Sequence, residues 1–161
     1  MQQHEKPVTR RSVVGLIGAI AVGALALPAY ADTYVVTVHR DPNCGCCSKW
    51  AEHLRAAGFV VKIEETSDLE AVRARLGVPS ALASCHTAEV NGYLIEGHVP
   101  AVAVRRLLTE RPAAKGLAVP GMPAGSPGME GSGEAEPYTV VLFGAGGPRP
   151  FMRFVGHRVV G

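Results

Sequence analysis

Residues 34–50 read YVVTVHRDPNCGCCSKW, and this stretch decides the expected fold. Its first six residues are mostly β-branched, which is typical of a strand, and Asp41-Pro42-Asn43 is a turn signal. A helix is expected to follow from about Cys46 to Ala57, with a second strand over residues 59–64. A strand–helix–strand unit of this kind pairs its strands in parallel through a right-handed crossover.

The next third of the chain predicts a helix, a hairpin and another helix. Ser67-Asp68-Leu69-Glu70 is a capping box, which opens a helix that we expect to end at Gly77. The strands of the hairpin are expected on either side of Asn91-Gly92, a type I′ turn signal, over residues 87–90 and 93–98. Pro100 suits the first turn of the last helix.

The C-terminal part changes character. Residues 116–137 are rich in Gly and Pro and show no regular period, so we expect a long loop that acts as a lid or is disordered. A final hairpin is expected over residues 138–143 and 151–155. The predicted class is therefore α/β and thioredoxin-like. A βαβ unit is followed by a helix, a β-hairpin and a helix, and then by the Gly/Pro-rich extension with its terminal hairpin.

Residues 1–31 have the features of an export signal. Lys6, Arg10 and Arg11 precede an apolar run over residues 13–27, and Ala29-Tyr30-Ala31 is a cleavage signature. The run is shorter than the roughly 20 residues that span a bilayer, so we expect no stable membrane insertion. Adjacent arginines after Thr9 also fit a twin-arginine signal, with an ordinary export signal as the alternative. We expect export to the periplasm and one metal-binding domain over residues 32–161.

Composition excludes several classes of function. The formal charge is +2, and aromatic residues make up 6% of the chain. Without residues 1–31, basic and acidic residues are equal in number. We therefore expect no nucleic-acid partner, because such a partner needs a basic surface or a stacking platform. The sequence also lacks the nucleophile-elbow and phosphate-loop motifs.

The four cysteines are the main functional signal. Cys44, Cys46 and Cys47 lie where a helix is expected to begin, and a helix N-terminus stabilises thiolates. Cys44 and Cys47 form a C-x-x-C pair at the usual place of a thioredoxin-like active site. By analogy with that fold, Cys85 and His86 start the hairpin and face the pair, with His86 where oxidoreductases carry a cis-proline. All four cysteines and His86 are thus expected to converge.

Copper is the metal that this cysteine pattern favours. Thiolates select Cu(I), Zn(II) or iron–sulfur clusters. Adjacent Cys46 and Cys47 do not easily chelate one ion tetrahedrally, whereas bridging thiolates in a multinuclear Cu(I) site fit them. Zinc is less favoured because two separated C-x₂-C knuckles are absent. Two alternatives stay open: a thiol–disulfide oxidoreductase that uses Cys44 and Cys47, and structural disulfides, Cys44–Cys47 and Cys46–Cys85.

Further candidate ligands lie later in the chain. His98 ends the hairpin, and Met122 and Met129 flank a Pro/Gly turn with thioethers that suit Cu(I). His86 is included as a ligand although neighbouring strand residues point to opposite faces, so the backbone there must be irregular. His53 is expected to be a solvated helix residue, and His39 an ordinary polar strand end.

The sequence resembles the small periplasmic metal-binding family that includes the CopG-type copper-resistance proteins. The matching stretches are Pro42–Cys47, Lys49-Trp50, Ser84–Thr87, Glu96–Pro100, Gly116–Pro123 and Gly125–Glu130. The resemblance implies a thioredoxin-like fold and copper held through cysteine sulfurs, as a multicopper cluster in one branch. It also implies periplasmic copper resistance, with other copper-handling proteins as partners. We expect metal binding ahead of turnover, with copper-dependent redox chemistry left open.

Overall fold

The computed structural model describes residue 2, residues 33–131 and residues 133–161. The expected export signal therefore lies outside the described residues. The helices are α1 (Gly45–Ala56), α2 (Leu69–Leu76) and α3 (Ala101–Glu110), and a short 3₁₀ turn, η1, covers Ser80–Leu82. The strands are β1 (Val35–Arg40), β2 (Val60–Glu65), β3 (His86–Val90), β4 (Tyr93–Glu96), β5 (Gly116–Ala118), β6 (Pro137–Phe143), β7 (Arg149–Val155) and β8 (Arg158–Val159).

The described strands form one sheet in the order β2-β1-β3-β4-β5-β6-β7-β8. β1 pairs in parallel with β2 and antiparallel with β3, so the predicted βαβ unit is confirmed. β3 and β4 form the predicted hairpin, where Asn91 (φ 48°) and Gly92 (φ 82°) both adopt the left-handed conformation of a type I′ turn. The expected terminal hairpin is β6 and β7.

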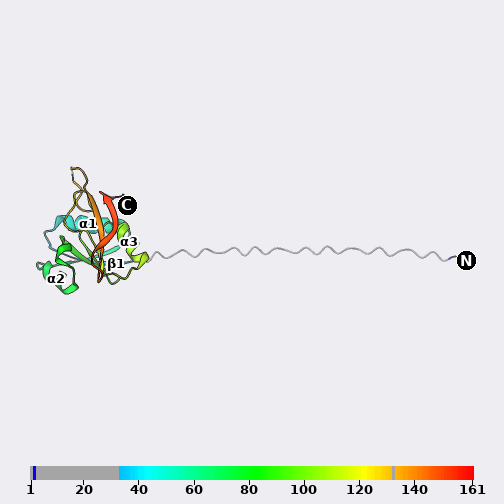
Figure 1. The fold of residues 1–161 in the computed structure, drawn as a ribbon, viewed down its shortest axis with the longest axis horizontal. Helices are drawn as coiled ribbons and strands as arrows, with labels where there is room; N and C mark the ends of the chain where they lie inside the picture. The colour runs from blue at the N-terminus through cyan, green and yellow to red at the C-terminus, as the bar shows by residue number, and fades with distance from the viewer. Residues whose placement is uncertain (1, 3–32, 132) are drawn as a thin grey trace. The chain divides into compact units, whose positions relative to one another are not determined.

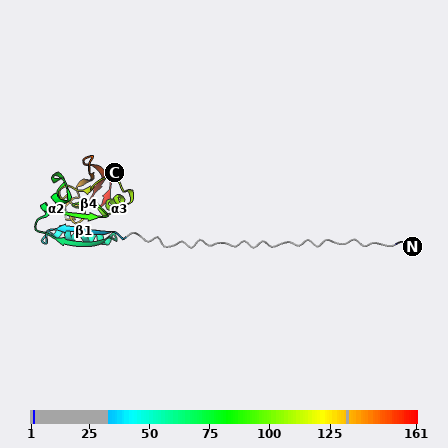
Figure 2. The same ribbon diagram turned by 90° about the horizontal axis from the view of Figure 1, so that it is seen from below.

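The helices are arranged so that α1 and α3 lie together. Ala101 at the start of α3 donates its N–H to His53 of α1, and Arg105 of α3 donates to the Ala57 carbonyl beyond α1. In both views, α2 and α3 lie at opposite sides of the folded domain (Figures 1 and 2). The main hydrophobic core includes Trp50 and Leu54 of α1, Leu107 of α3, Val38 of β1 and Phe154 of β7.

Three expectations about local structure are corrected. Gly116–Ala118 is not loop: it forms β5, which pairs in parallel with β4 and is fully buried. A second missed strand, β8, pairs with the end of β7. The cap of α2 is Asp68, whose side chain accepts from the Ala71 N–H, one residue after the serine expected to cap it.

None of the helices in the described part of the chain is long and apolar enough to cross a membrane.

Candidate metal centre

The first half of the site is the N-terminal turn of α1. Cys44 is the residue before the helix, and its N–H donates to the Asp41 carbonyl, so the predicted turn places the thiol at the helix start. Cys44 and Cys47 form a disulfide with a Cα–Cα distance of 5.4 Å. This pairing is one of those considered from the sequence. Cys46 is a free thiol, 3.5 Å (Sγ–Sγ) from Cys44.

The second half is Cys85 with two histidines. The Cys85 Sγ lies 3.7 Å from the Cys46 Sγ, and both thiols are free, so the other disulfide considered from the sequence is not formed. The same sulfur lies 3.3 Å from Nδ1 of His86 and 2.9 Å from Nε2 of His98. Cys85 precedes β3 rather than lying within it, which lets its side chain and that of His86 turn to one point.

These contacts define two overlapping groups. The four Sγ atoms of Cys44, Cys46, Cys47 and Cys85 all lie within 4.8 Å of one another. One ligand atom each of Cys85, His86 and His98 meets the same limit. We call the six residues together the cysteine–histidine cluster. The structure thus brings together six of the eight residues proposed as ligands from the sequence.

The histidine rings are oriented by their surroundings. His98 donates its Nδ1–H to the Pro127 carbonyl at 2.8 Å, which leaves the lone pair of Nε2 directed at Cys85. His86 is fully buried, packs its ring 4.3 Å from that of Trp50 (centroid to centroid), and leaves Nε2 without a hydrogen bond. Trp50 in turn donates to the Val99 carbonyl, so it forms a fixed wall beside the site.

Burial sets the protonation of the cluster. It raises the pKa of the Cys85 thiol to about 12, with the neighbouring Cys46 adding to the rise. Burial, then the nearby His98, lowers the pKa of His86 to about 3. The pKa of His98 is also lowered by burial. At neutral pH the metal-free cluster therefore holds a protonated Cys85 and two neutral imidazoles, which keep their lone pairs.

A buried carboxylate fixes the residues on either side of Cys85 and His86. Glu96 is fully buried, and its Oε1 accepts from the Ser84 N–H at 2.7 Å and from Nε of Arg73 at 2.9 Å. Its Oε2 accepts from the Thr87 hydroxyl at 2.6 Å. Burial raises the pKa of Glu96, while these donors oppose the rise. Glu96 thus hydrogen-bonds the residue before Cys85 and the residue after His86. The sequence did not reveal this role.

The loop before β6 closes over α1. Gly128 has a φ of +88°, and a Cβ there would lie 2.6 Å from the Cys46 carbonyl oxygen. Met129 is partly buried, and its N–H donates to the Ser126 carbonyl. Met122 is 54% exposed. The ligand roles expected for these two methionines remain predictions, and the loop contributes to the cluster through Pro127.

Two histidines differ from their expected surroundings. His53 is not simply solvated: its Nε2 accepts the Ala101 N–H at 3.0 Å and so caps α3. Burial first, and then His157, lower its pKa. His39, expected to be an ordinary polar strand end, is buried between Glu64 and Glu89 of the two neighbouring strands.

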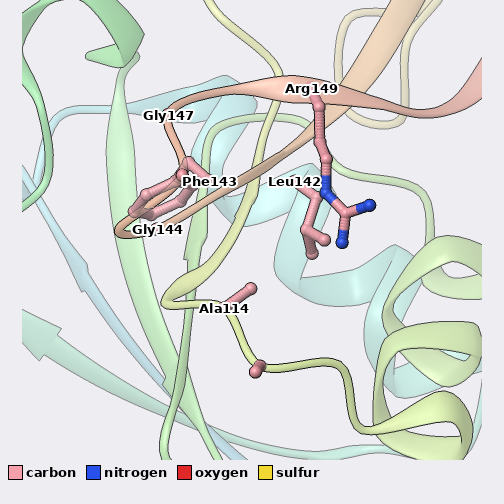
Figure 3. A pocket seen from close by; sticks show the side chains of 8 residues that line it. Ala114, Leu142, Phe143, Gly144, Gly147 and Arg149 are labelled. Atoms are coloured by element: carbon pink, nitrogen blue, oxygen red, sulfur yellow. The ribbon is translucent and has the colours of Figure 1, made fainter.

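A surface pocket lies elsewhere in the fold. It is lined by Ala114, Leu142, Phe143, Gly144, Gly147 and Arg149, among others, around the turn between β6 and β7 (Figure 3). None of its lining residues belongs to the cysteine–histidine cluster. The chemistry of the described residues therefore centres on the cluster and not on this pocket.

Two solved structures match the chain closely. One, "Copper resistance protein copG- Form 2", is 44% identical with a TM-score of 0.72 and is matched over 76% of this chain and 99% of its own. The chain belongs to the CopG family of copper-resistance proteins. A second structure of CopG, Form 1, is 46% identical with a TM-score of 0.71, over 76% of this chain and 98% of its own.

Membership of the CopG family confirms the resemblance stated from the sequence and the predicted α/β class. Residues 82–129 also match a family model described as a protein of unknown function, DUF411. That segment holds Cys85, His86, Glu96 and His98 but not the cysteines of α1. No curated protein matches the chain.

Proposed function

We propose that this chain is a copper-handling protein that binds Cu(I) through Cys44, Cys46, Cys47 and Cys85 once their sulfurs are reduced. The observation that carries the proposal is the approach of all four sulfurs within 4.8 Å. Bridging thiolates hold soft Cu(I) ions at this kind of spacing, and two of the sulfurs come from adjacent residues that suit bridging better than one chelate. Copper is the substrate of this site, and His86, His98, Met122 and Met129 complete the proposed ligand set.

The disulfide must open before four thiolates are available. Reduction of Cys44–Cys47 takes two electrons and two protons, which a dithiol reductant supplies as it forms its own disulfide. The high pKa of Cys85 means that its thiolate forms as copper displaces the proton. Binding should therefore release protons and strengthen as pH rises.

The proposed setting is the periplasm, and the proposed role is copper resistance by buffering or redox handling. Residues 1–31 would direct export, and residues 32–161 would form the working domain. The CopG structures support copper resistance as the role, because that is what their names state of them. Other periplasmic copper-handling proteins are the proposed partners.

A Cu(I) titration tests the proposal. The reduced chain, handled without oxygen, should retain several copper ions after desalting, counted by elemental analysis. Cys85→Ser should lower that number, whereas His157→Gln, outside the cluster, should leave it unchanged. Retention of no copper by the reduced wild-type chain would sink the proposal.

A thiol–disulfide oxidoreductase is the second candidate, favoured by the Cys44–Cys47 disulfide at the start of α1. His86, rather than a proline, opens β3 beside this disulfide, and it buries an imidazole where a substrate peptide would bind. Reduction of insulin by the metal-free chain measures this activity. Turnover abolished by Cys44→Ser but not by His98→Gln would favour the oxidoreductase.

A further inference from the structure

Cys85 belongs to both groups of the cluster, and only one of these groups depends on the disulfide. Joining Cys44 to Cys47 removes two of the four thiolates from the first group. The second group, Cys85 with His86 and His98, keeps all of its ligand atoms in the same state. The structure with the disulfide formed therefore still presents one thiol and two imidazoles.

The spacing of these three ligand atoms fits one ion. With metal–sulfur bonds near 2.3 Å and metal–nitrogen bonds near 2.0–2.1 Å, sulfur and nitrogen ligands of a tetrahedral ion lie about 3.5 Å apart. The Cys85 Sγ lies 3.3 Å from His86 Nδ1 and 2.9 Å from His98 Nε2. Lengthening by roughly 0.2 Å for His86 and roughly 0.6 Å for His98 would give both separations the required length.

The hydrogen bonds around the rings also leave room for a metal ion. Because His98 donates through Nδ1 to Pro127, its Nε2 is an acceptor that faces Cys85. His86 directs Nδ1 at the same sulfur and makes no hydrogen bond through its buried Nε2. The Cys85 S–H can donate to only one of the two rings, and the other ring meets the sulfur only as a weak acceptor, whereas a cation between the three atoms would take a lone pair from each.

We propose that the disulfide form of this protein binds a single divalent ion of borderline softness, such as Zn²⁺ or Cu²⁺, through Cys85, His86 and His98. Imidazole suits such ions, and three protein ligands leave a fourth position for water or another ligand. The proposal rests on the proposed function for its link to copper, since the two sites share Cys85, His86 and His98. A chain can then fill one site or the other, and the state of the Cys44–Cys47 pair decides which.

The test uses Co²⁺ alone, a probe that does not oxidise thiols. The full chain is first shown to carry two free thiols, and Co²⁺ is then added without oxygen. We expect one Co²⁺ per chain, with a near-ultraviolet sulfur-to-cobalt band and the strong visible bands of a four-coordinate ion. His157→Gln should keep both signals, because its ring lies outside the cysteine–histidine cluster.

His98→Gln and Cys85→Ser are the loss variants. Each should weaken Co²⁺ binding by more than the roughly 10–100-fold that follows from changing a group that only hydrogen-bonds a ligand. Absence of Co²⁺ binding by the wild-type disulfide form would overturn the inference, as would binding that needs Cys46 but not His98. A reduced chain that still retains several Cu(I) ions would show that the proposed function survives this failure. If the reduced chain retains no Cu(I), the function fails even where Co²⁺ binds.

Discussion

The two halves of the cysteine–histidine cluster are held in place in different ways. Partly exposed Cys44 precedes α1, buried Cys47 lies in its first turn, and a covalent bond joins them. Cys85, His86 and His98 lie near the ends of strands β3 and β4, where hydrogen bonds accepted by Glu96 and by the Pro127 carbonyl fix the surrounding backbone and the His98 ring. One half changes by redox chemistry, and the other is set by folding.

This difference teaches where variation should matter. Changes in the α1 half should alter which of the two proposed metal sites is filled and leave the fold intact. Changes in the strand half should affect stability and both proposed metal sites together. The following experiments test that division, starting with the largest expected effect.

Cys85→Ser should impair both sites, lowering the number of Cu(I) ions retained and weakening Co²⁺ binding, because Cys85 belongs to both groups of the cluster. Cys44→Ser should reduce Cu(I) retention by the reduced chain but leave one Co²⁺ bound through the other group. Elemental analysis and cobalt absorption measure the two outcomes on the same preparations. If Cys44→Ser and Cys85→Ser lose both metals equally, the division into two halves is wrong.

Glu96→Ala should be the most destabilising change to the strand half. It leaves the buried Arg73 without its closest carboxylate and frees the Ser84 N–H and the Thr87 hydroxyl. Breaking a buried ion pair of this kind costs about 3–5 kcal/mol in the free energy of unfolding. Urea unfolding of the variant and the wild-type chain measures this loss in the free energy of unfolding.

The matched control is Glu110→Ala, which removes a half-exposed ion pair with Arg106. Its cost should stay within about 1 kcal/mol. Glu96→Gln, which keeps one acceptor oxygen, should fall between the two. Equal midpoints for Glu96→Ala and Glu110→Ala would show that Glu96 does not support Cys85.

Gly128→Ala should have a smaller effect, which arises where the loop meets the α1 half. Gly128 has a φ of +88°, and an added Cβ would lie 2.6 Å from the carbonyl oxygen of Cys46 and 2.9 Å from the backbone nitrogen of Trp50. Strain and overpacking of this kind should together cost about 1–3 kcal/mol. Gly131→Ala, where a Cβ meets nothing within 4 Å, is the control in a thermal unfolding experiment.

Acid should destabilise the metal-free protein gradually. The pKa values of His53, His86 and His98 are all lowered from 6.5, so the unfolded chain binds more protons than the folded one below that pH. This contribution to stability is fully present above pH 6.5 and is lost progressively as the pH falls below that value toward the lower pKa values of the folded state, by at most about 1.4 kcal/mol per pH unit for each histidine. His53→Gln can still accept the Ala101 N–H and should flatten the slope measured by urea unfolding at several pH values. An unchanged slope would remove His53 from this account.

Periodic features of the sequence were enough to predict most of the fold. β-branched runs, the Asn91-Gly92 turn and the helix of Trp50 each carry a local pattern that survives in the structure. β5 carries no such pattern, because three small or apolar residues buried on both faces show neither alternation nor length. It forms because β4 and β6 offer it hydrogen-bonding partners on each side.

The candidate site was predictable in its ligands but not in its support. Spacing and fold analogy placed Cys85 opposite the cysteines of α1. No local pattern distinguishes Glu96 from a solvated strand end, since its burial depends on Arg73 of α2 and on Ser84. The hydrogen bonds accepted by His53 from Ala101 and by the Pro127 carbonyl from His98 likewise join segments brought together only by the complete fold.

The hydrogen bond from His98 to the Pro127 carbonyl is already made in the protein without metal. The imidazole has therefore lost its rotational freedom during folding, and an arriving ion need not order it. Immobilising a side chain costs about 0.5–1.5 kcal/mol, and a preorganised ring spares the binding step that cost. The preorganised ring should therefore raise the affinity of this histidine for an arriving ion.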